Sequence, residues 1–177
     1  MTVRLRHAGA EDAPALAALH ARSWRVSYAP YVPAEALGAP LDDNMRARWD
    51  SWPADRLILL AEDGDAVLGF AAVVRQDVPL LDNLHVDPDA RSGGVGARLL
   101  KMIAACLVEE GATALRLVVI ADNARARRFY VRMGGQEGTP HDETLLGATV
   151  RMVPFRWSGA AFDALAADFG RQSRKDA

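Results

Sequence analysis

A glycine-rich turn between an apolar run and a helix-like run constrains the fold of this 177-residue chain more than any other feature. The run PLLDNLHV, residues 79–86, has the composition of a strand. From residue 95 apolar side chains recur every three or four positions up to Gly111, as in an amphipathic helix. Gly93, Gly94 and Gly96 lie between the two runs. Because glycine has no Cβ, successive N–H groups can point into one concavity at the positive end of the helix. The turn predicts a phosphate site, against the alternative of a tight turn that binds nothing.

Two well-known phosphate-binding motifs do not match this turn. A P-loop requires a Gly-Lys pair, and the chain has none. A dinucleotide-binding fingerprint requires a third glycine, but the run that begins at Gly94 reads GVGARL, with leucine at that position. The spacing that is present is R-x-x-G-x-G, from Arg91 to Gly96.

The rest of the chain alternates strand-like and helix-like segments. Strands are predicted at 3–8, on both sides of the hairpin signal Asp63-Gly64-Asp65, at 113–120 and at 147–157; helices are predicted at 9–24, 41–52 and 123–135. The apolar run 113–120 is typical of a strand covered on both faces. This order predicts one α/β (α+β) domain over residues 1–157, with a mixed sheet and helices on both faces. Residues 158–177 are predicted to form an extension that begins as a helix and frays at its end.

Composition excludes several classes of protein. The formal net charge of -2 does not favour nucleic acid or an anionic membrane surface. No apolar run reaches the roughly 20 residues of a membrane span, and the N-terminus lacks the apolar core of a signal peptide. The single Cys106 and the scattered histidines give no disulfide framework and no metal-ligand spacing. We therefore expect a cytoplasmic, reduced protein without a metal, in which Cys106 has a packing role.

Two separate motifs in the chain resemble the GNAT superfamily of acyl-CoA-dependent N-acetyltransferases. NLHVDPDARSGGVGARLL is similar to that family's fourth strand, pyrophosphate loop and third helix. LVVIADNARARRFYVRMGG is similar to its fifth strand and the N-x-x-A-x-x-(F/L)-Y-x-x-x-G helix. The resemblance implies a mixed, mostly antiparallel twisted sheet of six to seven strands, with the fourth and fifth strands splayed apart.

The resemblance also implies acetyl-CoA as co-substrate and assigns the residues that bind it. Backbone groups of the fourth strand would pair with the pantetheine arm, and amides of the glycine turn would hold the pyrophosphate. The matching residues are Leu84, His85, Val86, Arg91, Ser92, Gly93, Gly94, Val95, Gly96, Ala97 and Asn123. Asn123 is also a candidate helix N-cap. Arg125, Arg127 and Arg128 are candidates for the 3′-phosphate or for an ordinary solvated face.

Tyr130 matches the tyrosine that protonates the departing thiolate in many relatives, although it could also be a core aromatic. The general base is less well defined, because relatives that use a fifth-strand glutamate carry it where this chain has Val118. Asp82 and His85 are the remaining local candidates, and we prefer Asp82. Their offset of three residues places them on opposite faces of a regular strand unless a bulge intervenes.

The acceptor is predicted to be a primary amine of a small molecule, attacked directly in a ternary complex. The alternatives are acetylation of protein N-termini or lysines, and a non-catalytic acyl-CoA-binding regulatory module. The segment from Trp24 to Trp52, rich in aromatic and acidic residues, is expected to cover the acceptor. Relatives often form dimers, so a homodimer is one assembly to expect. Gly135 stands where relatives carry a large apolar residue, which predicts a packing gap near the sheet and leaves the start of the sixth strand undefined.

Overall fold

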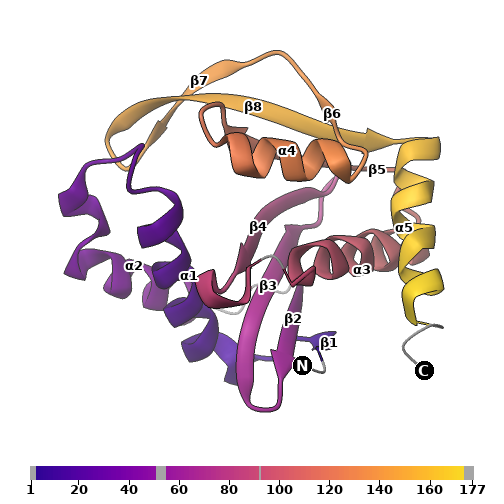
Figure 1. Cartoon of the computed structure of the whole chain (residues 1–177), viewed down its shortest axis with the longest axis horizontal. Helices are drawn as coiled ribbons and strands as arrows, with labels where there is room; N and C mark the ends of the chain where they lie inside the picture. Colours follow the sequence, from indigo (N-terminus) through magenta and orange to yellow (C-terminus); the bar gives the residue numbers. More distant parts are fainter. Residues whose placement is uncertain (1–2, 51–54, 92, 174–177) are drawn as a thin grey trace.

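The computed structural model describes residues 3–50, 55–91 and 93–173, and within this part of the chain one mixed sheet has helices on both faces (Figure 1). The strands are β1 (Arg4–His7), β2 (Arg56–Asp63), β3 (Ala66–Val74), β4 (Leu80–Val86), β5 (Ala114–Ile120), β6 (Gln136–Glu137), β7 (His141–Leu145) and β8 (Ala148–Ser158). The α-helices are α1 (Ala13–Ser27), α2 (Ala39–Asp50), α3 (Val95–Glu109), α4 (Ala124–Arg132) and α5 (Ala160–Ser173). Three 3-10 turns, η1 (Ala10–Asp12), η2 (Ala34–Leu37) and η3 (Pro88–Ala90), lie between them.

The eight strands of the sheet run in the order β1-β2-β3-β4-β5-β8-β6, and β7 also pairs with β8. Every neighbouring pair is antiparallel except β4 and β5. The count exceeds the expected six to seven because the segment between α4 and β8 forms two short strands, both paired with β8. The predicted fold class is confirmed, including the hairpin at Asp63-Gly64-Asp65, where Gly64 has φ +59°.

Two apolar layers cover the central strands from opposite sides. Side chains of β2 alternate: Leu57 and Leu59 pack in the layer that contains α3 and α5, whereas Ile58 and Leu60 pack in the layer that contains α1 and α2. Figure 1 shows α1 and α2 on one side of β2 to β4, and α3 with α5 on the other. Because both faces are covered, the central strands read as nearly continuous apolar runs.

The sheet opens between its two parallel strands. Residue pairing between β4 and β5 is limited to Leu80 with Arg116. Beyond that pair the strands diverge, so Val118 of β5 is 37% exposed, although the apolar run predicted cover on both faces. That prediction was wrong for this part of β5, because the splay leaves one side of the strand open.

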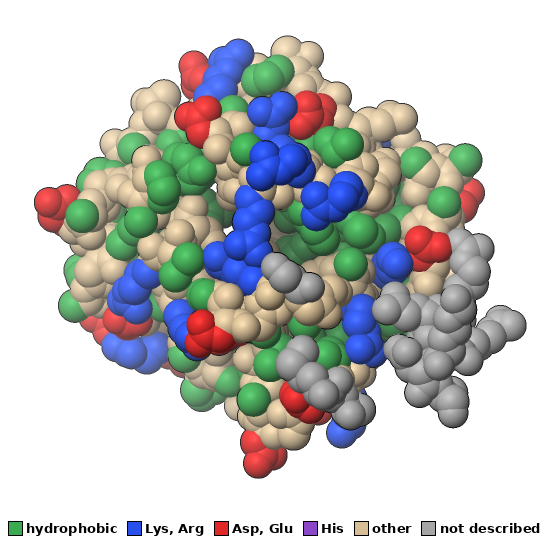
Figure 2. Space-filling view, viewed as in Figure 1, with side chains coloured by type: hydrophobic (Ala, Val, Ile, Leu, Met, Phe, Trp, Pro, Cys, Tyr) green, Lys and Arg blue, Asp and Glu red, His purple; other side chains and the backbone are tan. Residues whose placement is uncertain are grey.

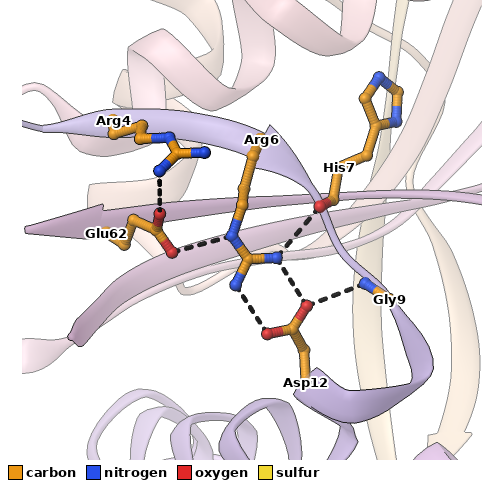
Figure 3. Close-up of polar contacts among 6 residues, drawn as sticks. All are labelled: Arg4, Arg6, His7, Gly9, Asp12 and Glu62. Atoms are coloured by element: carbon orange, nitrogen blue, oxygen red, sulfur yellow. Dashed lines mark hydrogen bonds and ion pairs between the residues drawn. The ribbon is translucent and has the colours of Figure 1, made fainter. Parts of the chain in front are cut away.

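The start of the chain is held by an ion-pair network (Figure 3). Arg6 donates to both carboxylate oxygens of Asp12, at 2.7 and 2.8 Å, and its Nε donates to Glu62 of β2 at 2.9 Å. Asp12 also accepts the Gly9 N–H. Asp12 directly precedes α1, but its carboxylate does not cap that helix with a hydrogen bond. Instead it ties β1 and η1 together, and the guanidinium lowers the pKa of Asp12.

Gly135 does not leave a packing gap, contrary to the expectation from the sequence. The indole of Trp157, which is fully buried, occupies that space and donates from Nε1 to the Met133 carbonyl at 2.8 Å. A Cβ on Gly135 would lie 2.6 Å from the Trp157 ring. The missing side chain is therefore what allows β8 to approach the end of α4.

The segment after β8 forms α5, which packs against α3. Phe162 and Leu165 are buried in the same apolar layer as Leu99 and Ile103 of α3. Fraying was expected over residues 171–177, but α5 continues to Ser173, and residues 174–177 lie outside the described residues. Within the described ranges, no helix is long and apolar enough to cross a membrane.

Candidate active site

A cavity of about 680 Å³ lies where β4 and β5 diverge. Its walls come from the end of α1 and the loop that follows, from β4 and β5, from the first turn of α3 and from α4. Most of the residues predicted from the sequence meet here: Asp82, Leu84, His85, Val86, Arg91, Gly94, Val95, Gly96, Ala97, Asn123 and Tyr130 all line the cavity. These residues come from segments that are far apart along the chain, and the structure brings them together around one cavity.

The glycine turn forms the end of the cavity at α3. Gly94 has φ +77°, a left-handed conformation that favours glycine, and the first helical bond runs from the Arg98 N–H to the Gly94 carbonyl. The N–H groups of Val95, Gly96 and Ala97 therefore have no intrahelical acceptor. Gly93 is not part of the lining, since its N–H donates to the Ala90 carbonyl at 3.4 Å, and Ser92 lies outside the described residues.

The edge of β4 forms a second wall. Leu84, His85 and Val86 pair with β3 on one side, but on the other side β5 has already diverged. Backbone groups of β4 that point toward β5 therefore lack a strand partner. A ligand that carries amide groups could pair with them as an added strand does.

Basic side chains surround the mouth of the cavity. Arg91, Arg125 and Arg132 line it, and the Arg91 guanidinium donates to Ser27 Oγ at 2.9 Å. Burial and the neighbouring Arg125 charge lower the pKa of Arg91. Arg127, on another face of α4, instead binds Glu137. Figure 2 shows Lys and Arg side chains gathered over α4 and beside a hollowed apolar area. The region suits an anion.

Asn123 and Tyr130 stand at the two ends of α4. Asn123 Oδ1 accepts the Ala126 N–H at 3.1 Å, so the predicted N-cap is confirmed, and the same residue lines the cavity. Tyr130 packs against Phe155 and Trp157 and also lines the cavity. Burial, and then the proximity of Tyr28, raises the pKa of Tyr130. Its phenol is thus neutral at physiological pH and can donate a proton or a hydrogen bond.

A bulge in β4 decides where Asp82 lies. Val73 of β3 pairs with Leu81, and the next β3 residue, Ala72, pairs with Asn83, so Asp82 is an extra residue without a partner. Leu81 and Leu84 both contact the α3 layer in spite of their odd spacing. Asp82 consequently lies on the α1–α2 side of the sheet, where Arg48 of α2 contacts its carboxylate.

His85 is enclosed on that same side. Its ring lies 4.5 Å from the His20 ring and 5.4 Å from the Phe70 ring, between centroids, and its Nδ1 is 3.0 Å from Ser23 Oγ. Burial and the nearby Arg91 and Arg48 charges lower the pKa of His85 to about 3. Burial also lowers the pKa of His20 to about 2. Both rings are neutral at physiological pH and accept protons poorly.

The side of the cavity toward α1 and α2 is aromatic. Tyr28 stacks on Trp24, with ring centroids 4.6 Å apart, and Tyr31 Oη donates to the Asp122 carbonyl at 3.1 Å. Tyr28 and Tyr31 line the cavity, whereas the described acids Glu35, Asp42, Asp43 and Asp50 do not. Asp42 instead pairs with Arg25, and Asp43 with Arg46. Trp52 lies outside the described residues.

Some contributors were not found by sequence reasoning. The sequence does not single out Ser23, which contacts His85, or Arg48 and Arg56, which contact Asp82. Their partners lie between 26 and 62 positions away in the chain, so no local spacing signals these contacts. For metals, no group of three or more His, Cys, Asp or Glu side chains in the described part of the chain could hold an ion.

Comparison with known proteins gives one consistent result. A family model described as "Acetyltransferase (GNAT) family" matches residues 16–135. An uncharacterized N-acetyltransferase of Mycobacterium bovis is 33% identical over 129 residues, which cover 70% of this chain and 82% of the relative.

Solved structures show the same fold. A GCN5-related N-acetyltransferase from Rhodopseudomonas palustris superimposes with a TM-score of 0.75 at 24% identity, over 90% of this chain and 97% of that one. The PaiA N-acetyltransferase from Thermoplasma acidophilum, solved with coenzyme A, gives a TM-score of 0.71 at 21% identity, over 90% and 100% of the two chains. This chain thus belongs to the acetyltransferase (GNAT) family and is an acetyl-CoA-dependent N-acetyltransferase.

Proposed function

We propose that this protein transfers the acetyl group of acetyl-CoA to the primary amine of a small molecule, by direct attack within a ternary complex. The observation that carries the proposal is the single cavity between β4 and β5, which contains the glycine turn, Tyr130 and Asp82. The diphosphate and the pantetheine amides of the coenzyme would then lie along one cavity, in which Tyr130 is the acid and Asp82 the proton acceptor.

The glycine turn and the β4 edge are proposed to bind the coenzyme. The N–H groups of Val95, Gly96 and Ala97 would hold the pyrophosphate at the positive end of α3, with Arg91 and Gly94 beside them. Leu84, His85 and Val86 would offer backbone groups to the pantetheine amides, with Asn123 on the opposite side. The absence of a Cβ at Gly96 supports this, because a side chain there would occupy space beside Val86 and Phe129, which both line the cavity.

Tyr130 is proposed to serve as the general acid. As the amine nitrogen forms its bond to the thioester carbonyl carbon, the carbon–sulfur bond breaks and its electron pair passes to sulfur. A neutral phenol can give its proton to that sulfur, and the raised pKa of Tyr130 keeps the phenol protonated. The reaction also requires that the amine nitrogen lose one proton.

Asp82 is proposed to accept that proton, directly or through water. The β4 bulge turns its carboxylate to the α1–α2 side, and it lines the cavity together with Tyr28 and Tyr130. His85 is a poorer choice, because burial lowers its pKa to about 3. The fifth-strand position used by some relatives is Val118, which has no proton to exchange.

The acceptor is proposed to be small and to carry one amine. Tyr31 joins the loop after α1 to the Asp122 carbonyl, so this segment crosses from α1 to the end of β5 and narrows the acceptor side of the cavity. Asp82 is the only carboxylate among the described residues that line the cavity. A polyamine would need further anions for its additional charges, and an extended polypeptide would need a more open groove.

The experiment is a thiol-release assay with acetyl-CoA and a panel of acceptors, followed by mass analysis of the product. The panel contains n-butylamine, phenethylamine, spermidine, single amino acids and a peptide with a free N-terminus. We expect a mass gain of one acetyl group on a monoamine. Binding of acetyl-CoA without acetylation of any acceptor would contradict catalysis and favour a regulatory binding module, and acetylation of the peptide alone would contradict the small acceptor.

A further inference from the structure

The carboxylate of Asp82 is held asymmetrically. Arg48 Nη2 of α2 lies 2.5 Å from Oδ2, Arg56 Nη1 of β2 lies 3.0 Å from it, and Asn83 Nδ2 lies 2.9 Å from it. All three donors converge on the same oxygen. No described residue donates a hydrogen bond to Oδ1.

We infer that Arg48 and Arg56 are positioning residues, which act on the reaction only through Asp82. They bind Oδ2 and leave Oδ1 as the acceptor for a hydrogen bond from the substrate amine. This inference rests on the proposed function, in which Asp82 faces the amine. It assigns to α2 and β2, neither of which lines the cavity, a direct influence on acceptor use.

The geometry supports this role. A bulged residue lacks the cross-strand partners that normally fix a side chain, so the direction of the Asp82 carboxylate depends on its own contacts. The two guanidiniums approach from different elements, and charge-assisted bonds from both restrict rotation of the carboxylate. The side chain of Asp82 is 26% exposed, and those of Arg48 and Arg56 are 38% and 22% exposed.

An ion pair on the same helix provides the contrast. Arg46 pairs with Asp43 one turn away, and their side chains are 63% and 76% exposed. Exposed pairs of this kind contribute little to stability or geometry. Arg46→Gln therefore removes the same charge from α2 as Arg48→Gln does, without touching Asp82, and serves as the matched control.

The test compares five single variants and one double variant in the thiol-release assay with n-butylamine. Asp82→Asn, Arg48→Gln and Arg56→Gln are each expected to lower kcat/KM for the amine by about 10-fold or more, because a small misplacement of a reacting group is costly. Arg46→Gln is expected to match the unchanged protein. The dissociation constant for acetyl-CoA, measured by calorimetry, should stay the same in all of them.

The double variant Asp82→Asn/Arg48→Gln makes the decisive comparison. If Arg48 acts only through Asp82, the double variant has the same kcat/KM as Asp82→Asn alone. If the losses in kcat/KM of the two single variants multiply in the double variant, the inference is overturned. An Arg48→Gln variant that is as active as Arg46→Gln would also overturn it. Arg48→Lys, which keeps the charge, should recover part of the activity, and circular dichroism reports whether each variant is folded. Failure of the unchanged protein to acetylate any amine would instead remove the proposed function itself.

Discussion

The two walls of the cavity are built in different ways. The glycine-turn wall presents mainly backbone groups at the start of α3 and along the edge of β4; its described lining residues are 84–86, Arg91 and 94–97. The α1–α2 wall, made of Tyr28, Tyr31 and Asp82, presents side chains. Tyr28 stacks on Trp24 of α1, whereas Tyr31 and Asp82 bind partners on other elements. The first wall is suited to a constant ligand and the second to a variable one.

This difference indicates which wall can change its ligand specificity without loss of the fold. Substitutions other than proline keep the backbone donors, so most changes disturb the glycine-turn wall only by adding atoms to it. The α1–α2 wall can be rebuilt by exchanging single side chains, because its aromatic and charged residues lie outside the sheet ladder. Each prediction below perturbs one wall and asks whether the other responds.

The largest effect is expected where the walls meet, at Tyr130. Tyr130→Phe removes the proposed acid and should lower kcat about 100-fold, the lower range for a lost general acid. The affinity for acetyl-CoA should hardly change, because the ring and its packing on Phe155 and Trp157 remain. Steady-state kinetics and calorimetry measure the two quantities, and unchanged turnover would remove the assignment.

Gly135→Ala tests the packing at the end of α4, the helix that carries Tyr130. The added Cβ would lie 2.6 Å from the Trp157 ring, so Trp157 or the end of α4 must move. We expect the free energy of unfolding to fall by about 2 kcal/mol, as in other overpacked cores. Urea denaturation measures this, and a variant as stable as the parent would show that the ring can yield without cost.

The buried histidines test the α1–α2 side. The folded-state pKa values of His20 and His85, about 2 and about 3, lie below their ordinary value of 6.5. Below about pH 6.5 the unfolded chain binds protons that the folded protein does not, so stability falls as the pH decreases. His20→Gln keeps an acceptor for Trp49 but does not titrate. Between about pH 7.5 and about pH 5 it should lose about 2 kcal/mol less stability than the parent. Equal losses in urea titrations would contradict a neutral buried His20.

The smallest effect is expected at Gly96. An alanine Cβ there would meet Val86 and Phe129 only at 3.5 and 3.6 Å, so the fold should accept it. The methyl group would nevertheless reduce access to the α3 amides and weaken acetyl-CoA binding about 10-fold, or about 1.4 kcal/mol. KM for the amine should stay the same. Tighter acetyl-CoA binding in Gly96→Ala would argue against a ligand on this backbone.

Sequence reasoning reached the glycine-turn wall more completely than the α1–α2 wall, for a physical reason. A phosphate site built from backbone groups requires glycine at fixed positions, followed by an amphipathic helix. Gly94 and the apolar repeat from Val95 can therefore be recognised in the sequence. The contact of Asp82 with Arg48 and Arg56 depends on how α2 and β2 fold over β4. The spacing of these three residues in the sequence does not predict the contact.

The same limit explains the misjudged details. From the sequence, Gly135 predicts a packing gap, because the residue that fills this space is Trp157, 22 positions later in the chain. Asp82 and His85 read as residues on opposite faces until pairing with β3 reveals the extra residue. In both cases the deciding partner comes from another strand, so local sequence carries no signal of it.

The extra residue in β4 also has a consequence for comparing relatives. If Asp82 were deleted, Leu81 and Asn83 would become consecutive and the ordinary alternation of the strand would be restored. All remaining side chains of β4 would keep their present faces. A one-residue gap at this column of an alignment would therefore mark chains that keep the fold yet lack this carboxylate. If Asp82 is the proton acceptor, as proposed, such chains take the proton from their amine by another route.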